Sequence, residues 1–170
     1  GEADLSFVEN VARTIAKHAI TPNIVVENST VPVNTGELIA EILIEQNGRK
    51  TSFEVVSNPE FLREGSAIHD FLQPDRIVIG PNSPIARKKM EELYAPLKCP
   101  IIFTDINSAE LIKHASNSFL ALKISYANAI ANLCEMTGAD VEQVVEGMGL
   151  DKRIGRSFLN AGIGYGGSCF

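Results

Sequence analysis

Two kinds of hydrophobic pattern alternate along the N-terminal part of the chain, and they predict helices that alternate with strands. Apolar residues at helical spacing indicate amphipathic helices, and short apolar runs that end in polar turns indicate buried strands. The predicted helices cover residues 5–19, 35–48 and 83–97, and the predicted strands cover residues 23–29, 53–57, 75–80 and 100–104. Strands that alternate with helices are typical of a mainly parallel sheet covered on both faces.

Local signals support several of these helix boundaries. Ser83 followed by Pro84 is a favourable pair for the start of a helix, since the hydroxyl can cap it and proline suits its first turn. Asn47 followed by Gly48 is a stop signal for the helix that precedes it. Residues 1–105 should therefore form an α/β unit.

The pattern changes after residue 105. Residues 108–137 contain neither proline nor glycine, and we expect a single helix of about 30 residues there, which is long for a globular protein. Gly138 should end it, and residues 139–150 predict a shorter helix. The expected fold class is α/β, with a partial Rossmann-type parallel sheet followed by an all-α region. Because the long helix is apolar on more than one face, we expect it to form a two-fold dimer.

Composition narrows the functional classes. The chain has 170 residues, of which 45 % are hydrophobic and 21 % charged, and its net charge is −6. An acidic chain argues against nonspecific nucleic-acid binding, and the sequence predicts neither a membrane span nor a signal peptide nor a metal site. Its three cysteines are far apart and form no CxxC motif, which favours a reducing, cytoplasmic setting. Cys134 lies in an apolar helical pattern and should be buried.

The usual dinucleotide fingerprint does not occur in the usual place. A sheet that binds a dinucleotide normally begins with a strand followed by GxGxxG and a helix. The match at residues 162–167, GIGYGG, follows no predicted strand. The chain opens directly in a predicted helix, so we expect it to be an excerpt from a longer protein, cut at both ends.

Two pairs of polar residues stand out as candidate chemistry. Glu60 and Glu64 in SNPEFLREG follow a predicted strand, at the edge where open α/β sheets bind ligands. Taken in isolation, the pair is better explained by a solvated first helical turn. Lys113 and Asn117 are four residues apart on the long helix and share a face. They could stabilise an oxyanion, or they could belong to a solvated stripe.

Two further segments are ambiguous when taken alone. The hydroxyls of Ser29 and Thr30 in STVP could cap the next helix, contact a phosphate or position a water molecule. Residues 162–170, GIGYGGSCF, present Cys169 behind four glycines. Such a segment could let the backbone approach a ligand closely, or it could be an ordinary flexible end.

In combination these segments resemble the UDP-glucose/GDP-mannose dehydrogenase family. The resemblance covers nearly the whole chain and rests on five stretches: ADLSFVENVARTIAKH, STVPVNTGEL, SNPEFLREGSAIHDFLQPDRIVIG, AELIKHASNSFLALKISYANAIANLCE and RIGRSFLNAGIGYGGSCF. The QPDRIVIG segment and the phenylalanine after the cysteine are closer to the UDP-glucose branch than to the GDP-mannose branch. Asn34 stands where many relatives have glycine, and Asn tolerates left-handed geometry.

The resemblance implies a role for each site residue. Cys169 matches the catalytic nucleophile, Glu60 the acid/base group, Lys113 and Asn117 the oxyanion-stabilising pair, and Thr30 a hydroxyl near the nicotinamide and the hydrolytic water. The implied cofactor is NAD, with contacts from Ser29, Thr30, Val31, Glu64 and Cys169. The implied substrate contacts are Glu60, Phe61, Leu62, Glu64, Lys113, Asn117, Arg153, Phe158, Gly162, Tyr165 and Gly166. Arg153 matches an arginine that reaches the substrate of the neighbouring subunit.

The resemblance also implies domains, a reaction and a partner. Residues 1–105 would be the C-terminal part of an NAD-binding domain without its GxGxxG unit, and residues 106–170 a helical central domain that ends at the cysteine loop. The implied reaction oxidises the C6 alcohol of UDP-glucose to a carboxylate with NAD, through a thiohemiacetal and a thioester on Cys169. The long helix would form a homodimer. This chain alone should be inactive and bind NAD weakly.

Three alternatives to this interpretation stay open at the level of the sequence. The substrate could be GDP-mannose or another nucleotide sugar. The chain could be a non-catalytic dimerisation module, because the long helix could pair without any cofactor. Cys169 could be a thiol redox switch, although no resolving cysteine is close to it in the sequence.

Overall fold

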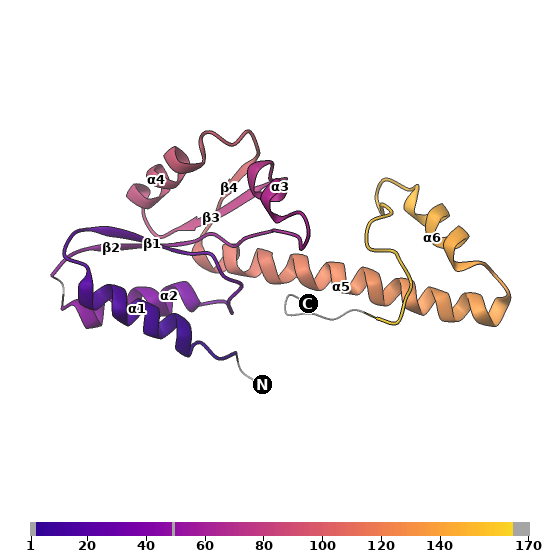
Figure 1. Cartoon of the computed structure of the whole chain (residues 1–170), viewed down its shortest axis with the longest axis horizontal. Helices are drawn as coiled ribbons and strands as arrows, with labels where there is room; N and C mark the ends of the chain where they lie inside the picture. The colour runs from indigo at the N-terminus through magenta and orange to yellow at the C-terminus, as the bar shows by residue number, and fades with distance from the viewer. Residues whose placement is uncertain (1–2, 49, 165–170) are drawn as a thin grey trace. The chain divides into compact units, whose positions relative to one another are not determined.

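The computed structural model describes residues 3–48 and 50–164 (Figure 1). These residues fall into two compact units, divided between residues 113 and 114. The predicted domain boundary at residue 105 stays a prediction. No helix in the described part of the chain is long and apolar enough to cross a membrane.

The first unit contains a four-stranded sheet in the order β1-β2-β3-β4. Its strands are β1 (Asn23–Glu27), β2 (Phe53–Ser57), β3 (Ile77–Pro81) and β4 (Ile101–Phe103). The pairs β1–β2 and β3–β4 are parallel, as expected. The pair β2–β3 is antiparallel and short: Val56 pairs with Pro81, and Ser57 pairs with Gly80. The sheet is therefore mainly parallel, as predicted, with one antiparallel pair.

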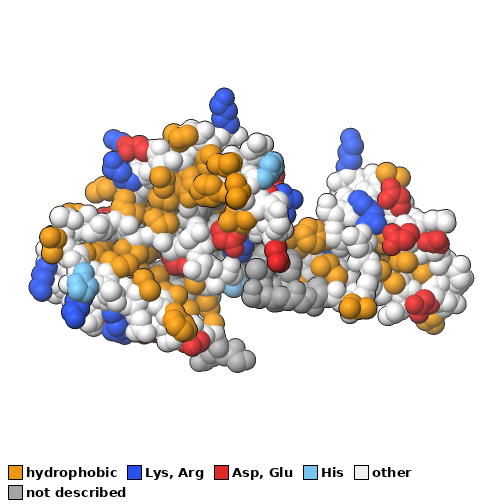
Figure 2. Space-filling view, viewed as in Figure 1, with side chains coloured by type: hydrophobic (Ala, Val, Ile, Leu, Met, Phe, Trp, Pro, Cys, Tyr) orange, Lys and Arg blue, Asp and Glu red, His pale blue; other side chains and the backbone are white. Residues whose placement is uncertain are grey.

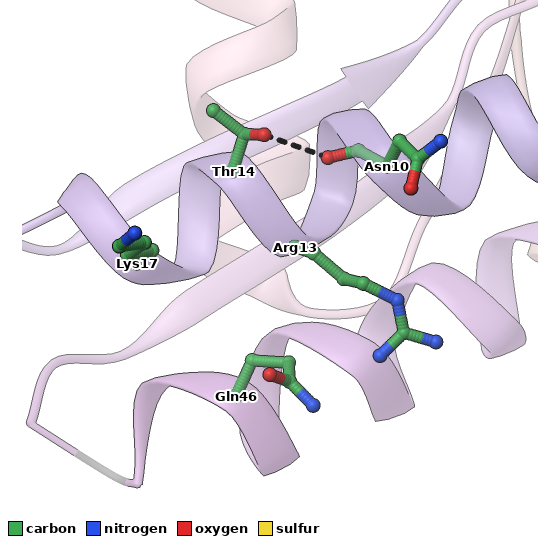
Figure 3. A pocket seen from close by; sticks show the side chains of 5 residues that line it. All are labelled: Asn10, Arg13, Thr14, Lys17 and Gln46. Carbon is green, nitrogen blue, oxygen red and sulfur yellow. Dashed lines mark hydrogen bonds between the residues drawn. The ribbon is translucent and has the colours of Figure 1, made fainter.

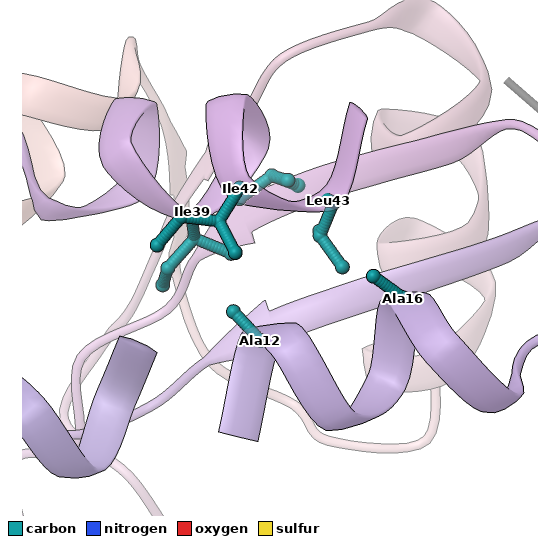
Figure 4. Packing of buried hydrophobic residues seen from close by; sticks show 6 residues of the cluster. Ala12, Ala16, Ile39, Ile42 and Leu43 are labelled. Atoms are coloured by element: carbon teal, nitrogen blue, oxygen red, sulfur yellow. The ribbon is translucent and has the colours of Figure 1, made fainter. Parts of the chain in front are cut away.

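Helices cover both faces of the sheet, as the alternating pattern predicted. Helices α1 (Ser6–His18) and α2 (Thr35–Asn47) pack on one face, and α4 (Pro84–Tyr94) packs on the other. Val55 and Val56 are neighbours in β2 and point to opposite faces, so each joins a different hydrophobic cluster. Figure 4 shows the α1–α2 cluster, which contains Ala12, Ala16, Ile39, Ile42 and Leu43.

The predicted boundary signals act as expected. The Ser83 side chain accepts a hydrogen bond from the Ala86 N–H, and Pro84 occupies the first turn of α4. Gly48 ends α2 with φ of 61°. Asn34 precedes α2 with φ of 79°, which is the left-handed geometry expected for this position.

Two differences concern single elements. Helix α3 (Ala67–Leu72) was not predicted; it is the shortest helix in the described part of the chain, and its Ile68 side chain is exposed. Strand β1 was expected to be buried and to reach residue 29, but it ends at Glu27, and Val26 is 39 % exposed. The exposure follows from its place, because β1 is an edge strand of the described sheet.

The second unit consists of most of a long helix, a shorter helix and a loop. Helix α5 (Ile106–Thr137) begins in the first unit and runs unbroken, and α6 is Val141–Gly149. Gly138 follows α5 with φ of 75°, and Cys134 is buried, both as predicted. The Lys123 ammonium donates to the carbonyls of Ile154 and Gly155 at 3.0 and 3.3 Å, which ties the loop after α6 to α5.

Candidate functional site

The loops after β1 and β2 emerge at the same edge of the sheet. The two strands are parallel, with Glu27 paired to Ser57 at their ends. Beyond them the chains stay joined, because the Asn58 N–H donates to the Glu27 carbonyl at 2.8 Å and the Glu60 N–H donates to the Asn28 carbonyl at 3.3 Å. Thr30 and Glu60 therefore follow neighbouring strand ends, as the topology predicted.

A buried lysine of α5 contacts this edge. The Lys113 ammonium donates to the Glu60 carbonyl at 2.6 Å and lies 3.0 Å from the Glu60 carboxylate oxygen Oε1. The Lys113 side chain is only 6 % exposed, whereas that of Glu60 is 30 % exposed. A buried ammonium needs such partners, since an unpaired charge in the interior is costly. The structure thus joins two predicted site residues that are 53 positions apart in sequence.

Phe61 and Leu62 continue the same segment. The Arg76 guanidinium lies 3.9 Å from the centre of the Phe61 ring, and the Lys113 ammonium lies 5.3 Å from it. Both are within the range of a cation–π contact. The Leu62 N–H donates to Glu60 Oε2 at 2.6 Å, so the carboxylate is oriented from its own loop as well as by Lys113.

A buried asparagine fixes the start of this segment. The Asn58 amide group donates to the Val78 carbonyl at 2.8 Å, and its oxygen accepts from the Tyr94 hydroxyl. The Asn58 backbone carbonyl accepts from the Asn28 side chain. Burial raises the pKa of Tyr94, which keeps this hydroxyl a donor. Asn58 therefore ties the loop that carries Glu60 to β3, α4 and the loop after β1.

A charged clamp fixes the other end of the segment. The Asp70 carboxylate accepts from the Arg63 N–H at 2.9 Å, the Arg63 guanidinium Nε at 3.0 Å and the Ser66 hydroxyl at 3.0 Å. The bond from the Arg63 guanidinium is the main reason why the pKa of Asp70 lies well below its usual range. Glu64 lies between these anchors with an exposed side chain, and neither Glu60 nor Glu64 is in a helix. The alternative that they form a first helical turn is therefore wrong.

The loop after β1 presents two exposed hydroxyl residues and one buried valine. Ser29 and Thr30 are exposed, and Val31 is 5 % exposed. The N-cap residue of α2 is Asn34, so neither hydroxyl occupies the capping position. The alternative that Ser29 or Thr30 caps the next helix is therefore wrong.

Two buried carboxylates hold the ends of this loop. Glu27 Oε1 accepts from the Ser29 N–H at 2.6 Å. Glu110, from the first turns of α5, accepts from the Asn34 N–H at 2.8 Å and from the Gly36 N–H at 2.7 Å. Burial raises the pKa of Glu27, the bonds from Ser29 oppose the rise, and the nearby Glu110 carboxylate adds to it.

The remaining predicted residues lie in the second unit or outside the described chain. Asn117 follows Lys113 by one turn of α5 and is half-buried. Arg153 is exposed, and its guanidinium contacts the Asp151 carboxylate at 2.6 Å. Phe158 has φ of 66°, and the Gly162 N–H donates to the Asn128 side-chain oxygen at 2.8 Å. Tyr165, Gly166 and Cys169 lie outside the described residues.

A hollow in the first unit lies away from this edge. It has a volume of about 390 Å³ and lies between α1 and α2, as Figure 3 shows. Its lining residues are Asn10, Arg13, Thr14, Lys17 and Gln46. None of them is a predicted site residue. Within the residues that the structure describes, no three His, Cys, Asp or Glu side chains gather in a way that could hold a metal ion.

Sequence reasoning missed four polar residues that organise the site: Glu27, Asn58, Asp70 and Glu110. Each is buried. Glu27 and Asn58 had a weak signal, since each stands at the end of an apolar strand pattern. Asp70 and Glu110 had none, because their partners are remote in sequence or lie in a loop.

Two family models match the chain. Residues 1–98 match the NAD binding domain of the UDP-glucose/GDP-mannose dehydrogenase family, and residues 107–170 match the central domain of that family. The resemblance implied NAD as the cofactor, and the family model that matches residues 1–98 describes an NAD binding domain.

Individual relatives point the same way. The chain is 55 % identical over its whole length to the UDP-glucose 6-dehydrogenase TuaD of Bacillus subtilis, of which it covers 37 %. It matches the structure of a UDP-glucose dehydrogenase from Pyrobaculum islandicum with a TM-score of 0.96 and 47 % identity, over 99 % of this chain and 40 % of that one. A GDP-mannose dehydrogenase from Pseudomonas aeruginosa matches with a TM-score of 0.85 and 33 % identity, over 99 % of this chain and 41 % of that one.

The chain thus spans about two fifths of the length of the relatives that it matches. Two consecutive domains of one family account for nearly all of its residues. The chain belongs to the UDP-glucose/GDP-mannose dehydrogenase family.

Proposed function

We propose that the protein containing this chain oxidises the C6 alcohol of UDP-glucose to the carboxylate of UDP-glucuronate, with NAD as the oxidant. Each of the two oxidation steps would consume one NAD. The observation that carries the proposal is the contact between buried Lys113 and Glu60 at the carboxyl edge of the sheet, beside the exposed Ser29 and Thr30. Relatives named for UDP-glucose are more similar to the chain than the relative named for GDP-mannose.

The residues at this edge fit the nicotinamide end of NAD. Nucleotides bind open α/β sheets at the carboxyl ends of parallel strands, where β1 and β2 end here. Exposed Ser29 and Thr30 offer polar groups at this edge, and buried Val31 anchors the loop that carries them. When bound there, NAD would accept the hydride that leaves C6 of the sugar.

Glu60, Lys113 and Asn117 would handle the protons and negative charge of the reaction. The alcohol proton would leave C6–OH through Glu60, directly or by way of a water molecule. The Lys113 ammonium, and the Asn117 amide one turn further along α5, would stabilise the oxygen as it gains negative charge. The ammonium already lies 3.0 Å from Glu60 and is almost fully buried, which strengthens its electrostatic effect.

Cys169 would carry the intermediate between the two oxidations. Its thiolate would add to the aldehyde carbon and form a thiohemiacetal, whose oxidation gives a thioester. Water would then cleave the thioester, releasing the carboxylate and restoring the thiol. A covalent intermediate prevents release of the reactive aldehyde and divides one difficult step into easier ones. Phe61, Leu62, Glu64, Arg153, Phe158, Gly162, Tyr165 and Gly166 are the further residues that we assign to substrate binding.

Helix α5 would also form a homodimer. Large apolar side chains of its second half are exposed: Phe119 at 61 %, Leu122 at 60 %, Leu133 at 53 % and Met136 at 84 %. Exposed apolar area of this kind favours a protein interface. A second copy of the helix would cover it.

The experiment is steady-state and product analysis of the full-length protein with NAD and UDP-glucose, alongside its Cys169→Ser variant. We expect two NADH per UDP-glucuronate from the unmodified protein and no uronate from the variant, because a hydroxyl without an activating base is a poor nucleophile. The variant should still bind UDP-glucose. Normal uronate formation by the variant would refute the role of the thiol, and a preference for another nucleotide sugar would refute the substrate.

A further inference from the structure

Helix α5 begins with a buried face that carries two charged residues. Ile106, Ala109, Glu110 and Lys113 follow the spacing of a single helical face, and Glu110 and Lys113 are only 2 % and 5 % exposed. Charged side chains are rarely buried so deeply without specific partners. Lys113 has its partners in Glu60. The partners of Glu110 lie at the start of α2.

Glu110 contacts the end of the loop that carries Ser29 to Val31. Its two carboxylate oxygens accept separately from the N–H groups of Asn34 and Gly36. Asn34 is the N-cap residue of α2, yet its side chain makes no capping bond. A carboxylate from another helix therefore does the capping, in the position where a negative charge also suits the helix dipole.

The packing around these bonds leaves no room for adjustment. A Cβ atom added to Gly36 would lie 2.5 Å from the Ile106 side chain and 3.3 Å from Glu110 Oε1. Gly80 of β3 meets the same turn of α5, since a Cβ there would lie 2.6 Å from the Asp105 carbonyl and 2.8 Å from Ile106 Cα. The start of α5 is therefore fixed between the start of α2 and the end of β3.

We propose that Glu110 is a positioning residue that sets the place of the Ser29–Val31 loop relative to Lys113. Glu110 and Lys113 are one turn apart on α5, and one holds the loop after β1 while the other holds the loop after β2. The proposal rests on the proposed function, in which the first loop contacts NAD and the second contacts the sugar. The distance between hydride donor and acceptor then depends on this one turn of helix.

The test compares Glu110→Gln with Glu110→Asp and with Glu41→Gln in the full-length protein. A glutamine has one acceptor oxygen, and its amide group would face the second backbone N–H as another donor. Aspartate keeps the charge and both acceptors but is one methylene shorter, so it should restore part of the effect. Glu41 lies on α2 with an exposed side chain, and its variant controls for loss of charge.

The first measurement needs no activity. Hydrogen–deuterium exchange should become faster at residues 29–36 in Glu110→Gln and stay unchanged in β3 and α4, and the Kd for NAD should rise several-fold. Unchanged exchange at residues 29–36 would overturn the proposal even if the protein proves to act on a different substrate.

The second measurement is kinetic. With UDP-glucose, kcat should fall by about tenfold to a hundredfold, because a small misplacement of reacting groups is enough for that loss. The KM for UDP-glucose should change by less than about twofold, since Lys113 and Glu60 keep their contact. Faster exchange with unchanged kcat would overturn the positioning role. An unmodified protein that oxidises no nucleotide sugar would instead refute the proposed function, while the exchange and NAD data would still decide whether Glu110 holds the loop.

Discussion

The two parts of helix α5 reverse the usual distribution of polar and apolar side chains. In its first turns, which belong to the α/β unit, the charged residues Glu110 and Lys113 are buried. In its later turns, Phe119, Leu122 and Met136 are exposed. A surface helix in an ordinary globular protein buries its apolar stripe and exposes its charges.

The two parts of α5 therefore have different roles: the first part contacts loops of its own unit, and the second part exposes a surface that a partner could cover. Buried charges are stable only with partners inside the same unit, and Glu110 and Lys113 have them in the loops after β1 and β2. Exposed apolar side chains gain stability only from a partner outside the chain. Figure 2 shows that hydrophobic side chains also gather on the surface of the α/β unit.

The largest effect should come from Lys113→Met in the full-length protein. Methionine fills much of the same space but cannot stabilise a developing oxyanion, so kcat should fall by roughly 10²–10³-fold. The matched control on the same helix is Lys123→Met, which removes bonds to the Ile154 and Gly155 carbonyls. That variant should alter KM more than kcat. Equal losses of kcat in both variants would contradict a special role for the charged first turns.

The second prediction concerns the apolar half of α5. Leu122→Glu places a charge at a side chain that is 60 % exposed, and it should raise the dissociation constant of the proposed dimer by about a hundredfold or more. Leu93→Glu on α4 changes an equally exposed side chain, at 63 %, in the other unit. It should leave the dimer intact in sedimentation velocity. If Leu93→Glu dissociated the dimer and Leu122→Glu did not, the interface would not lie on α5.

The same contrast explains what could be predicted from the sequence. The hydrophobic pattern was sufficient to predict the strands and most of the helices, because the spacing of apolar residues shows which face of an element is buried. It did not predict that β2 and β3 are antiparallel, as the connection between them, residues 58–76, is long enough for either geometry. The short helix α3 within that connection left no signal, since its apolar Ile68 and Phe71 are exposed.

The site was predictable only as separate pieces. The NPEF segment and the lysine of α5 could each be recognised, but their contact depends on how α5 packs against the sheet, and no local spacing determines that. Glu110 shows the limit most clearly. Nothing in its local sequence indicates its partners, and only the tertiary structure shows that its helical face is buried against the start of α2.

The third prediction tests whether a paired charge stabilises the α/β unit. Asp70→Asn removes the charge that several donors share, so the temperature of unfolding should fall by a few degrees. Because the folded pKa of Asp70 lies below the unfolded value of 3.8, its contribution is present above that pH and is lost as the pH falls through the folded pKa. Asp151→Asn breaks an exposed pair with Arg153 and should have almost no effect on unfolding. Equal shifts in both variants would contradict the distinction.

The smallest effect should come from Glu27→Gln, which tests a buried charge whose pairing is incomplete. Oxygen Oε2 of Glu27 is buried and has no hydrogen-bond partner among the described residues, and the neighbouring carboxylate is Glu110. Because the pKa of Glu27 is raised from 4.5 by burial, folding favours its protonated form. That contribution to stability is fully present below pH 4.5 and is lost as the pH rises through the folded pKa.

Glutamine cannot ionise, and its amide oxygen can still accept from the Ser29 N–H. Relative to the unmodified protein, Glu27→Gln should therefore be more stable at neutral pH, and this gain should disappear below the unfolded pKa. Urea unfolding at both pH values measures the difference, with Glu135→Gln, an exposed residue of α5, as the control. The amide occupies the same site at both pH values, so any steric cost cancels in the comparison. A free-energy difference that does not change with pH would show that the charge of Glu27 does not destabilise the folded protein. Burial would then not explain why Glu27 and Asp70 should contribute to stability at opposite ends of the pH range.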